Sequence, residues 1–422
     1  MEIIDSYKHF MALGDADLVF LGYQDDILKI VKRNFPNEDA YNQVRTVNAC
    51  IIAKLKPYNE KITNQLDYLN SIVSPEQRSP EWHAQRKMLI SASDGYKACS
   101  ARNTVCYKKL VLKKLGIEEA ASYPADAMIH GTMFEIVSQR LYETRFSVHI
   151  REYGCIQHST YPFIGASPDG IVNSVDDPTD LAQFSHIGRM LEIKNPYSRI
   201  IDETIKPEYA FQIQQQLEVC NLDVCDFLET EINSAVREKK PYSREVIIKP
   251  VYASFEDFMS DSLSDDSTEI QQNVGIPRGN HSKDGRERGV LLQFRNAGLF
   301  GRSHLSVLYP IETPYIAEEI EAWKQATIKE MEANNYQIDI THYWKLKVFD
   351  IKTVIRDKEE WSSMCGNLTS FWDDVERCRA MTPRELVEEF KNIIEIQSDG
   401  KCGFIKKRRS LENKDTYRFS DE

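Results

Sequence analysis

Two short stretches decide the fold, Gly165-Ala-Ser-Pro-Asp-Gly-Ile-Val172 and Met190-Leu-Glu-Ile-Lys-Asn-Pro196. The first places Asp169 in a Pro-Asp-Gly turn that leads into an apolar strand. The second places Glu192 and Lys194 two residues apart, so on a strand their side chains share one face. The apolar residues beside Glu192 then point the opposite way, into a core. We therefore expect two carboxylates and one ammonium group to meet on neighbouring strands.

These residue types suit the hydrolysis of a phosphodiester. Two carboxylates can hold a hard cation such as Mg²⁺. A lysine beside them can position or help to deprotonate an attacking water, or stabilise a pentavalent phosphate. Each half is a weak signal alone, and the alternative is a hairpin whose solvent face carries a cross-strand ion pair. Because both halves occur together and in order, the metal-dependent site is the favoured interpretation.

Two predicted helices flank these strands. Glu135 lies in a stretch with helical apolar spacing, and its apolar neighbours predict at least partial burial. A buried carboxylate needs a cation or a hydrogen-bond partner, whereas the alternative for Glu135 is a polar helix surface. Downstream, Pro207 to Leu217 combines Tyr209 with glutamines at several helical positions.

Four motifs therefore follow one another along the chain: Glu135, Asp169, Glu192-x-Lys194, and Tyr209-x-x-Gln212-x-Gln214. They resemble the PD-(D/E)xK nuclease core of the lambda-exonuclease type, also called the YqaJ viral recombinase type. The resemblance extends to Trp82-x-x-x-Arg86 and to the Ser-Ala-Ser that ends at Ser93. The long C-terminal extension is more similar to the alkaline exonucleases of large eukaryotic DNA viruses such as baculoviruses.

The resemblance implies a mixed α/β (α+β) fold with a restriction-endonuclease-like core. A small mixed central sheet flanked by helices, in the order α-β-β-β-α-β, is expected. The implied activity is a Mg²⁺-dependent deoxyribonuclease that degrades linear double-stranded DNA from an end, 5′ to 3′. Viral DNA recombination, replication or genome processing would be its setting. One or two Mg²⁺ ions are implied, and Mn²⁺ can substitute.

The resemblance also assigns roles to single residues. Asp169 and Glu192 would bind the metal, and Glu135 would complete or support the shell. Lys194 would orient or activate the water. Gln212 would align Lys194 or the water, and Gln214, two residues on, is the nearest wrong choice for this role.

Four further residues would hold phosphates of the DNA: Arg86, Ser93, Ser167 and Arg199. A guanidinium fork suits a phosphate, and a serine near a helix start offers a hydroxyl and backbone N–H groups. The alternative for Arg86 and Ser93 is a surface arginine and a helix N-cap. Arg199 follows Lys194 by five residues, which is one residue fewer than the spacing in the phage pattern.

Two other functions remain open from the sequence. One is a catalytically silent DNA-binding recombination scaffold, and the other is an endonuclease of the same fold that also cuts RNA. The expected partners are double-stranded DNA ends, together with a viral single-strand annealing or single-strand-binding protein that the family alone implies. No apolar run long enough for a membrane span occurs in the sequence.

Charge is distributed unevenly along the 422 residues. The net charge is −12, yet residues 78–115 hold nine Lys or Arg against two acids. This basic segment predicts a DNA-facing surface, with a solvated helix face as the alternative. The nine scattered cysteines lack zinc-ligand context and indicate reduced thiols inside a cell. Lys406 to Arg409 is a weak nuclear localisation pattern, so the host nucleus or a viral replication compartment is expected.

The chain divides into five expected segments: a helical N-terminal cap at 1–75, the nuclease core at 76–250, a flexible insertion or boundary at 251–287, C-terminal strands and helices packed on the core at 288–400, and a basic tail at 401–422. Glu229 and Glu231 form a same-face pair, for which a solvated sheet edge is favoured over a metal role. Trp361 and Phe371 are expected in the core rather than as base-stacking platforms.

Overall fold

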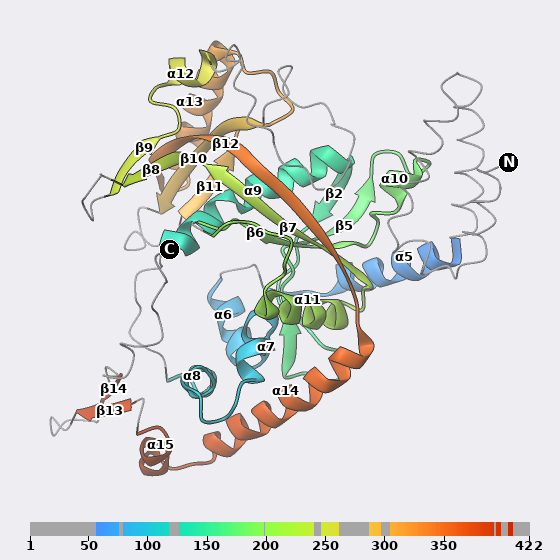
Figure 1. Cartoon of the computed structure of the whole chain (residues 1–422), viewed down its shortest axis with the longest axis vertical. Helices are drawn as coiled ribbons and strands as arrows, with labels where there is room; N and C mark the ends of the chain where they lie inside the picture. The colour runs from blue at the N-terminus through green and yellow to red at the C-terminus, as the bar shows by residue number, and fades with distance from the viewer. Residues whose placement is uncertain are drawn as a thin grey trace.

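The computed structural model of the chain describes residues 56–75, 79–117, 126–197, 199–239, 246–260, 287–296, 304–391, 394–397 and 404–407 (Figure 1). Most of the predicted N-terminal cap, most of the predicted insertion at 251–287 and most of the predicted tail lie outside these residues. Among the described helices, none combines the length and apolarity of a membrane span.

A seven-stranded mixed sheet in the order β11-β10-β12-β7-β6-β5-β2 forms the centre of the molecule. Its strands are β2 (Val148–Arg151), β5 (Gly170–Val175), β6 (Met190–Lys194), β7 (Val224–Asn233), β10 (Arg288–Asn296), β11 (His304–Leu308) and β12 (Tyr336–Ile355). Helix α9 (Asp126–Phe146) precedes β2, and α11 (Pro207–Cys220) connects β6 to its parallel neighbour β7. The mixed α/β class and the α-β-β-β-α-β order of the core are confirmed.

The C-terminal strands continue this sheet instead of packing on it as a separate layer. Strand β12 runs antiparallel beside β7, from the pair Ile355↔Val224 to the pair Lys345↔Asn233. Strands β10 and β11 extend the sheet beyond β12 (Figure 1). The central sheet is consequently wider than the small sheet that the sequence suggested.

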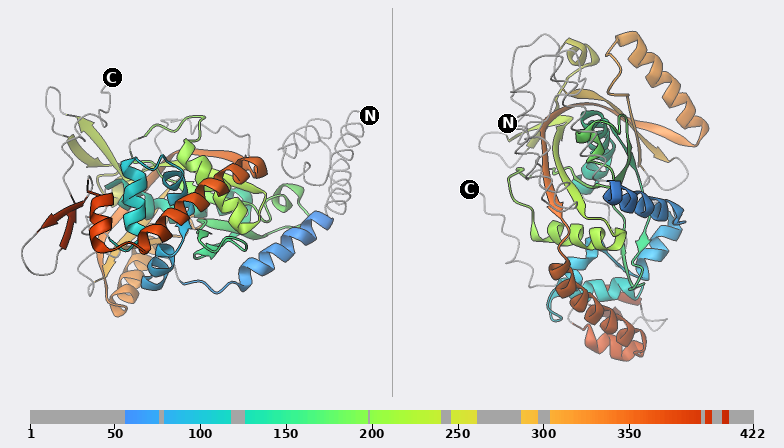
Figure 2. Two further views of the ribbon diagram at one scale, coloured as in Figure 1. Left: turned by 90° about the horizontal axis from the view of Figure 1, so that it is seen from below. Right: turned by 90° about the vertical axis from the view of Figure 1, so that its right-hand side faces the viewer.

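Helices cover both faces of the core strands, and strand periodicity decides which residue meets which helix. Leu191 and Ile193 of β6 belong to the apolar cluster that contains Phe134 and Val137 of α9. Met190 belongs to the cluster on the other face, with α11 and the helices below it (Figures 1 and 2). Glu192 and Lys194 share the face of Met190 and therefore turn toward α11.

A second, three-stranded sheet lies beside the first and is made of β1 (Ile90–Ser91), β3 (Ile156–Gln157) and β4 (Ile164–Ala166). The chain leaves the large sheet after β2 and enters this small one at β3. Gly154 lies between them, where a Cβ atom would come within 2.6 Å of the Pro75 carbonyl oxygen. The bend therefore needs glycine.

Two short helices, α6 (Pro80–Lys87) and α7 (Ala92–Ala98), pack against the small sheet, and α8 (Val105–Lys114) packs against α7. Helix α7 lies so close to α11 that a Cβ atom on Gly95 would stand 2.5 Å from the Phe211 ring. This close approach holds the segment after β1 against the helix that also faces Glu192.

The remaining elements lie around these layers: α5 (Lys56–Ser71), α10 (Leu181–Phe184), β8 (Ala235–Lys239), β9 (Val246–Pro250), α12 (Phe255–Ser260), α13 (Ala317–Ala333), α14 (Lys358–Arg379), α15 (Pro383–Glu389), β13 (Ile394–Gln397) and β14 (Phe404–Lys407). Helix α14 buries Trp361 and Phe371 in the core, as predicted. A capping box at Thr382 and Glu385 begins α15.

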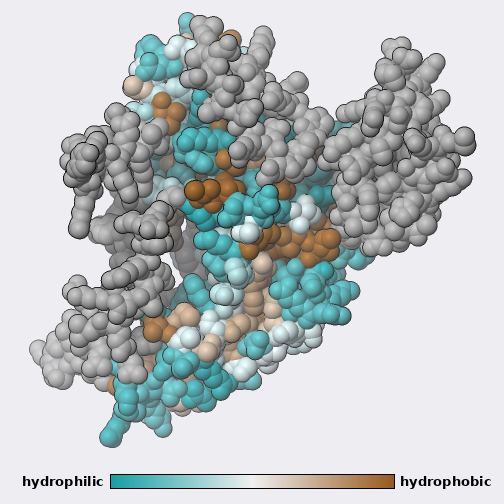
Figure 3. Space-filling view, viewed as in Figure 1, coloured by the Kyte–Doolittle hydropathy of each residue, from teal (hydrophilic) through white to brown (hydrophobic). Residues whose placement is uncertain are grey.

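Figure 3 shows the surface of the molecule in the view of Figure 1. Apolar residues gather near the middle of this face, and its lower part is mainly hydrophilic.

Candidate active site

The two carboxylates of the decisive stretches meet on neighbouring strands. Strand β5 pairs antiparallel with β6 through Gly170↔Leu191, so one step before β5 Asp169 stands level with Glu192. The Ile193 backbone N–H donates a hydrogen bond to Asp169 Oδ2 at 2.7 Å. This contact fixes the Asp169 carboxylate at the end of the pair of strands.

Glu192 is buried, with 1% of its surface exposed, and side chains surround its carboxylate. Gln212 Nε2 donates to Glu192 Oε1 at 2.6 Å, and Gln216 Nε2 donates to Glu192 Oε2 at 2.7 Å. Lys194 forms an ion pair with Glu192 Oε1 on the same strand. A buried carboxylate with three donors is held in one orientation, because each oxygen is committed to a partner.

Lys194 remains a cation in this setting. Burial works against the charge of Lys194, but the charges of Glu192 and Asp169 outweigh burial and hold the pKa of Lys194 above its usual value. The ammonium nitrogen also lies 5.3 Å from the centroid of the Tyr209 ring, which favours a positive charge. Lys194 therefore keeps its proton at neutral pH.

Asp169 experiences the opposite electrostatic setting. Burial, followed by the charges of Glu192 and Glu135, raises the pKa of Asp169 well above its usual value. Added positive charge at this point would relieve the repulsion, and the oxygens of Asp169 and Glu192 are the ligand type that a hard divalent cation prefers. These two residues thus fit a Mg²⁺ ion in charge and donor chemistry.

Glu135 is near enough to act on Asp169 through its charge, but it stands on α9, which covers the other face of the sheet. Within the described part of the chain, no three acidic, histidine or cysteine side chains form a ready-made metal cluster. The predicted shell of three carboxylates is therefore not preformed. Glu135 lines a pocket of about 580 Å³ between α9, the segment after α5 and the loop between β2 and β3.

The helix α11 supplies one glutamine more than the sequence predicted. Gln212 contacts Glu192 rather than Lys194, and Gln216, one helical turn later, contacts the other oxygen of Glu192. Residues four apart share a helix face, so this spacing was the available signal for Gln216. Gln214 turns away and bonds the Ile355 carbonyl oxygen at 2.8 Å. The sequence favoured Gln212 over Gln214 as the glutamine of the site, and this geometry agrees with that choice.

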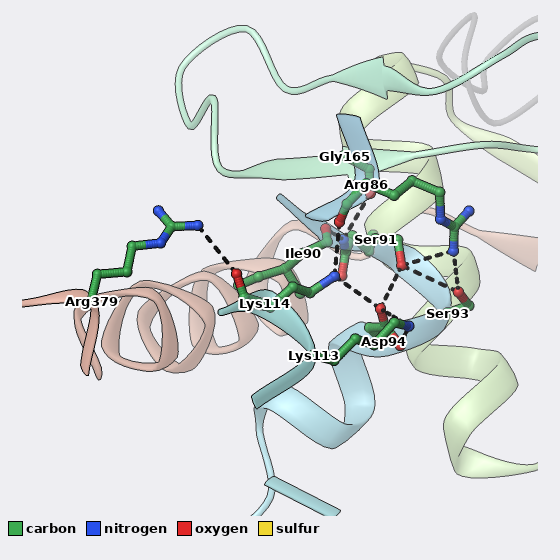
Figure 4. Close-up of polar contacts among 10 residues, drawn as sticks. Arg86, Ile90, Ser91, Ser93, Asp94, Lys113, Lys114, Gly165 and Arg379 are labelled. Atoms are coloured by element: carbon green, nitrogen blue, oxygen red, sulfur yellow. Dashed lines mark hydrogen bonds and ion pairs between the residues drawn. The ribbon is translucent and has the colours of Figure 1, made fainter. Parts of the chain in front are cut away.

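Arg86 and Ser93 come together as predicted (Figure 4). Arg86 Nη2 donates hydrogen bonds to Ser93 Oγ and to Ser91 Oγ, both at 3.0 Å. The guanidinium carbon lies 4.3 Å from the centroid of the Trp82 ring, which supports the planar group from one side. Ser91 pairs with Gly165 of β4 in the small sheet. Gly165 precedes Asp169 by four residues, so the cluster of Arg86, Ser91 and Ser93 lies beside the segment that leads to Asp169.

Ser167 and Arg199, the two other predicted phosphate contacts, have different surroundings. The Ser167 hydroxyl is buried near the Cys155 thiol and makes no hydrogen bond of ordinary geometry to the described residues. Such an orphaned hydroxyl suits a ligand contact. Arg199 is engaged, because it forms an ion pair with Glu229 of β7.

Glu229 does not lie at a solvated edge, and this expectation was wrong. Strand β7 has neighbours on both sides, and Glu229 is 1% exposed. Besides Arg199, Lys352 of β12 contacts Glu229 Oε2 at 2.9 Å and also pairs with the buried Asp350. Since Lys194 and Glu229 are Cα partners in the parallel ladder, this charged cluster adjoins the site directly.

Residues 81–223, which contain this whole arrangement except Glu229 and the strands beyond it, match the family model of the YqaJ-like viral recombinase domain. This segment of the chain therefore resembles a YqaJ-like viral recombinase domain. An uncharacterized protein of Acanthamoeba polyphaga mimivirus is 30% identical over 338 residues, which are 74% of this chain and 54% of that protein. The chain thus spans about half the length of this curated relative.

Solved structures with some likeness to the chain include the alkaline exonuclease LHK-Exo from Laribacter hongkongensis, alone and in complex with dAMP. Each is 16% identical, and the match covers 74% of this chain and 99% of the other. The TM-scores are 0.38 and 0.37. The YqaJ-like domain includes the elements α6 to α11, which carry Arg86, Glu135, Asp169, Glu192 and Gln212.

Proposed function

We propose that this protein is a Mg²⁺-dependent deoxyribonuclease that degrades linear double-stranded DNA from an end. The observation that carries the proposal is the pairing of Asp169 and Glu192 beside a protonated Lys194, inside a YqaJ-like viral recombinase domain.

The residues around the site have separate tasks in this proposal. Asp169 and Glu192 would hold Mg²⁺, which when bound polarises the scissile phosphate and lowers the pKa of its water. Gln212 and Gln216 keep the Glu192 carboxylate oriented. Lys194, which keeps its proton, stabilises the negative charge of the pentavalent phosphate instead of accepting a proton from water.

The raised pKa of Asp169 supports an alkaline working range. A carboxylate must be ionised to bind a metal, and burial together with two neighbouring carboxylates resists that ionisation. Metal binding at Asp169 should therefore strengthen as the pH rises. Cleavage should therefore increase as the pH rises through the raised pKa of Asp169.

Arg86 and Ser93 would anchor a phosphate at the end of the DNA, and Ser167 adds a hydroxyl from the neighbouring segment. Arg199 would have to leave Glu229 to reach a phosphate. Lys352 stays paired with Glu229 in that event, so the buried carboxylate keeps a counter-ion. A 5′-to-3′ direction and a partner that anneals or binds single strands stay predictions from the family resemblance, as do the roles in viral recombination and replication.

The test is digestion of end-labelled linear duplex by the full chain with Mg²⁺, beside circular DNA and RNA. The variants Glu192→Ala and Lys194→Ala should lose cleavage while they retain DNA binding. Glu231→Ala is the matched control, because this partly exposed carboxylate contacts Lys347 instead of the site. Near-normal digestion by either site variant refutes the assignment.

The same substrates separate the other two functions. Binding of DNA without any cleavage, and without carboxylate-dependent uptake of Mg²⁺ in isothermal titration, identifies a silent scaffold. Cleavage of circular DNA and RNA at a rate similar to linear DNA identifies an endonuclease of broader specificity. Labels at the 5′ or the 3′ end give the direction of digestion.

A further inference from the structure

A chain of polar groups stands behind Arg86 and Ser93, as Figure 4 shows. Arg86 donates to Ser91 Oγ at 3.0 Å, and Ser91 Oγ donates in turn to Asp94 Oδ2 at 3.1 Å. Lys114 Nζ donates to the same Asp94 oxygen at 3.0 Å and to the Arg86 carbonyl oxygen at 3.0 Å. The lysine therefore ties the end of α6 to the first turn of α7.

The order of donors along this chain is fixed by chemistry. An ionised carboxylate accepts hydrogen bonds and donates none. Burial opposes the charge of Asp94, but the neighbouring Lys114 and Lys113 outweigh it and hold the pKa of Asp94 well below its usual value. The single hydroxyl hydrogen of Ser91 is thus committed to Asp94, and its oxygen is left to accept from Arg86.

This commitment affects the exposed Ser93. The two serine oxygens are 3.3 Å apart, and Arg86 donates to both. Since Ser91 already gives its hydrogen to Asp94, Ser93 is the donor in any contact between the two hydroxyls. An anion in front of Ser93 can accept that hydrogen and an N–H of Arg86 together.

The charges of the cluster also favour an anion. Three cations, Arg86, Lys113 and Lys114, surround the single carboxylate of Asp94. The Lys114 side chain is 1% exposed, whereas that of Lys113 is 54% exposed. Both lysines pair with Asp94, so the four side chains together carry two more positive than negative charges, and Lys113 is the more exposed of the two lysines.

We propose that Ser91 is a positioning residue, through which the buried Asp94–Lys114 pair orients the Arg86 guanidinium and the Ser93 hydroxyl for the terminal phosphate of a DNA strand. Neither Ser91, Asp94 nor Lys114 touches the phosphate in this arrangement. The inference rests on the proposed function. It assigns recognition of the DNA end to a relay of hydrogen-bonded side chains that lies behind Arg86 and Ser93.

The test measures binding of the full chain to fluorescent duplexes that end in a 5′ phosphate or a 5′ hydroxyl, by anisotropy in EDTA. The wild type should bind the phosphorylated end more tightly. Ser91→Ala should reduce the ratio of the two Kd values by about tenfold, because a hydrogen bond to a charged group is lost behind Arg86. Ser91→Thr, which keeps the hydroxyl, should restore the preference.

Two further variants guard the interpretation. Ser91→Cys keeps the shape but is a weak donor, so it should behave like Ser91→Ala. Ser100→Ala is the matched control, since this exposed serine near the end of α7 contacts the Tyr96 carbonyl oxygen. A thermal melt of each variant confirms that it is folded.

The proposal is overturned if Ser91→Ala and Ser91→Cys keep the full preference for the phosphate, or if they weaken both ends equally. It is also overturned if the wild type does not distinguish the two ends. Because binding is measured without a metal, a wild type that prefers phosphorylated ends but digests nothing with Mg²⁺ refutes the proposed nuclease activity and leaves the relay supported.

Discussion

Asp169→Asn should be more stable than the wild type in the absence of a divalent metal and less stable than the wild type when the metal is bound. In the folded chain the Asp169 carboxylate is buried and repelled by Glu192 and Glu135, which raises its pKa. Each unit of such a rise costs about 1.4 kcal/mol where the unfolded chain is ionised. The weaker hydrogen bond from the Ile193 N–H to an amide loses about 1 kcal/mol. We therefore expect Asp169→Asn to be more stable than the wild type near pH 8 in EDTA, because relief of the carboxylate repulsion and of desolvation exceeds the loss in hydrogen-bond strength.

The sign of the pH dependence follows from the same shift. The folded protein holds the Asp169 proton more tightly than the unfolded chain, so the contribution of Asp169 to wild-type stability should fall as the pH rises above about 4. Asp169→Asn should lack this contribution. Saturating Mg²⁺ should reverse the order, because a ligand at one hundred times its Kd stabilises the wild type by about 2.7 kcal/mol.

The assay is urea unfolding, with and without Mg²⁺, over a range of pH. Asp176→Asn is the matched control, since this carboxylate has 57% of its side chain exposed beside His149. The control should change stability by less than about 0.5 kcal/mol. The reasoning is refuted if Asp169→Asn is less stable than the wild type in EDTA, or if Mg²⁺ stabilises both proteins equally.

Three other changes test neighbouring contacts. Gln216→Ala removes one donor to Glu192 and should lower the rate of cleavage of linear duplex by about 10- to 100-fold. Gln214→Ala is the control and should change stability but not this rate. Equal cleavage rates for the wild type and Gln216→Ala would contradict the role of Gln216. Asp94→Asn should flatten the loss of stability in acid, because the lowered pKa of Asp94 contributes stability above about pH 4 that is lost as the pH falls; an unchanged urea–pH profile would contradict this. Lys352→Met should cost about 3–5 kcal/mol in urea unfolding, because it removes the lysine that contacts the buried Asp350 and leaves the buried Glu229 with Arg199 as its cationic partner. A cost below about 1 kcal/mol would show that the cluster around Lys352 is not needed for the fold.

Local periodicity explains why the centre of the site could be predicted. Glu192 and Lys194 had to share a face because side chains alternate along a strand, and the register with β5 then brought Asp169 level with Glu192. The apolar neighbours of Glu192, Leu191 and Ile193, reinforced this prediction, and both are buried. A pattern that depends on a few consecutive residues survives folding unchanged.

Pairings between distant segments explain what could not be predicted. Glu229 was assigned to a solvated edge because nothing nearby in the sequence reveals that β12, more than one hundred residues later, pairs with β7. Lys114 belongs to a basic segment that was predicted to face DNA, or else solvent, but it is buried against Asp94 because α8 packs on α7. Gln216 had a usable signal in its spacing from Gln212, but choosing it required knowing which face of α11 meets β6.

The place of β12 in the sheet has a consequence for synthesis. The ribosome finishes the YqaJ-like domain long before it reaches Tyr336, and until then β7 lacks its second neighbour and Glu229 lacks Lys352. A nascent chain in that state presents an open strand edge, which invites pairing with other chains. The catalytic half would therefore mature only after its C-terminal half emerges, so fragments that stop near residue 250 should be prone to aggregate.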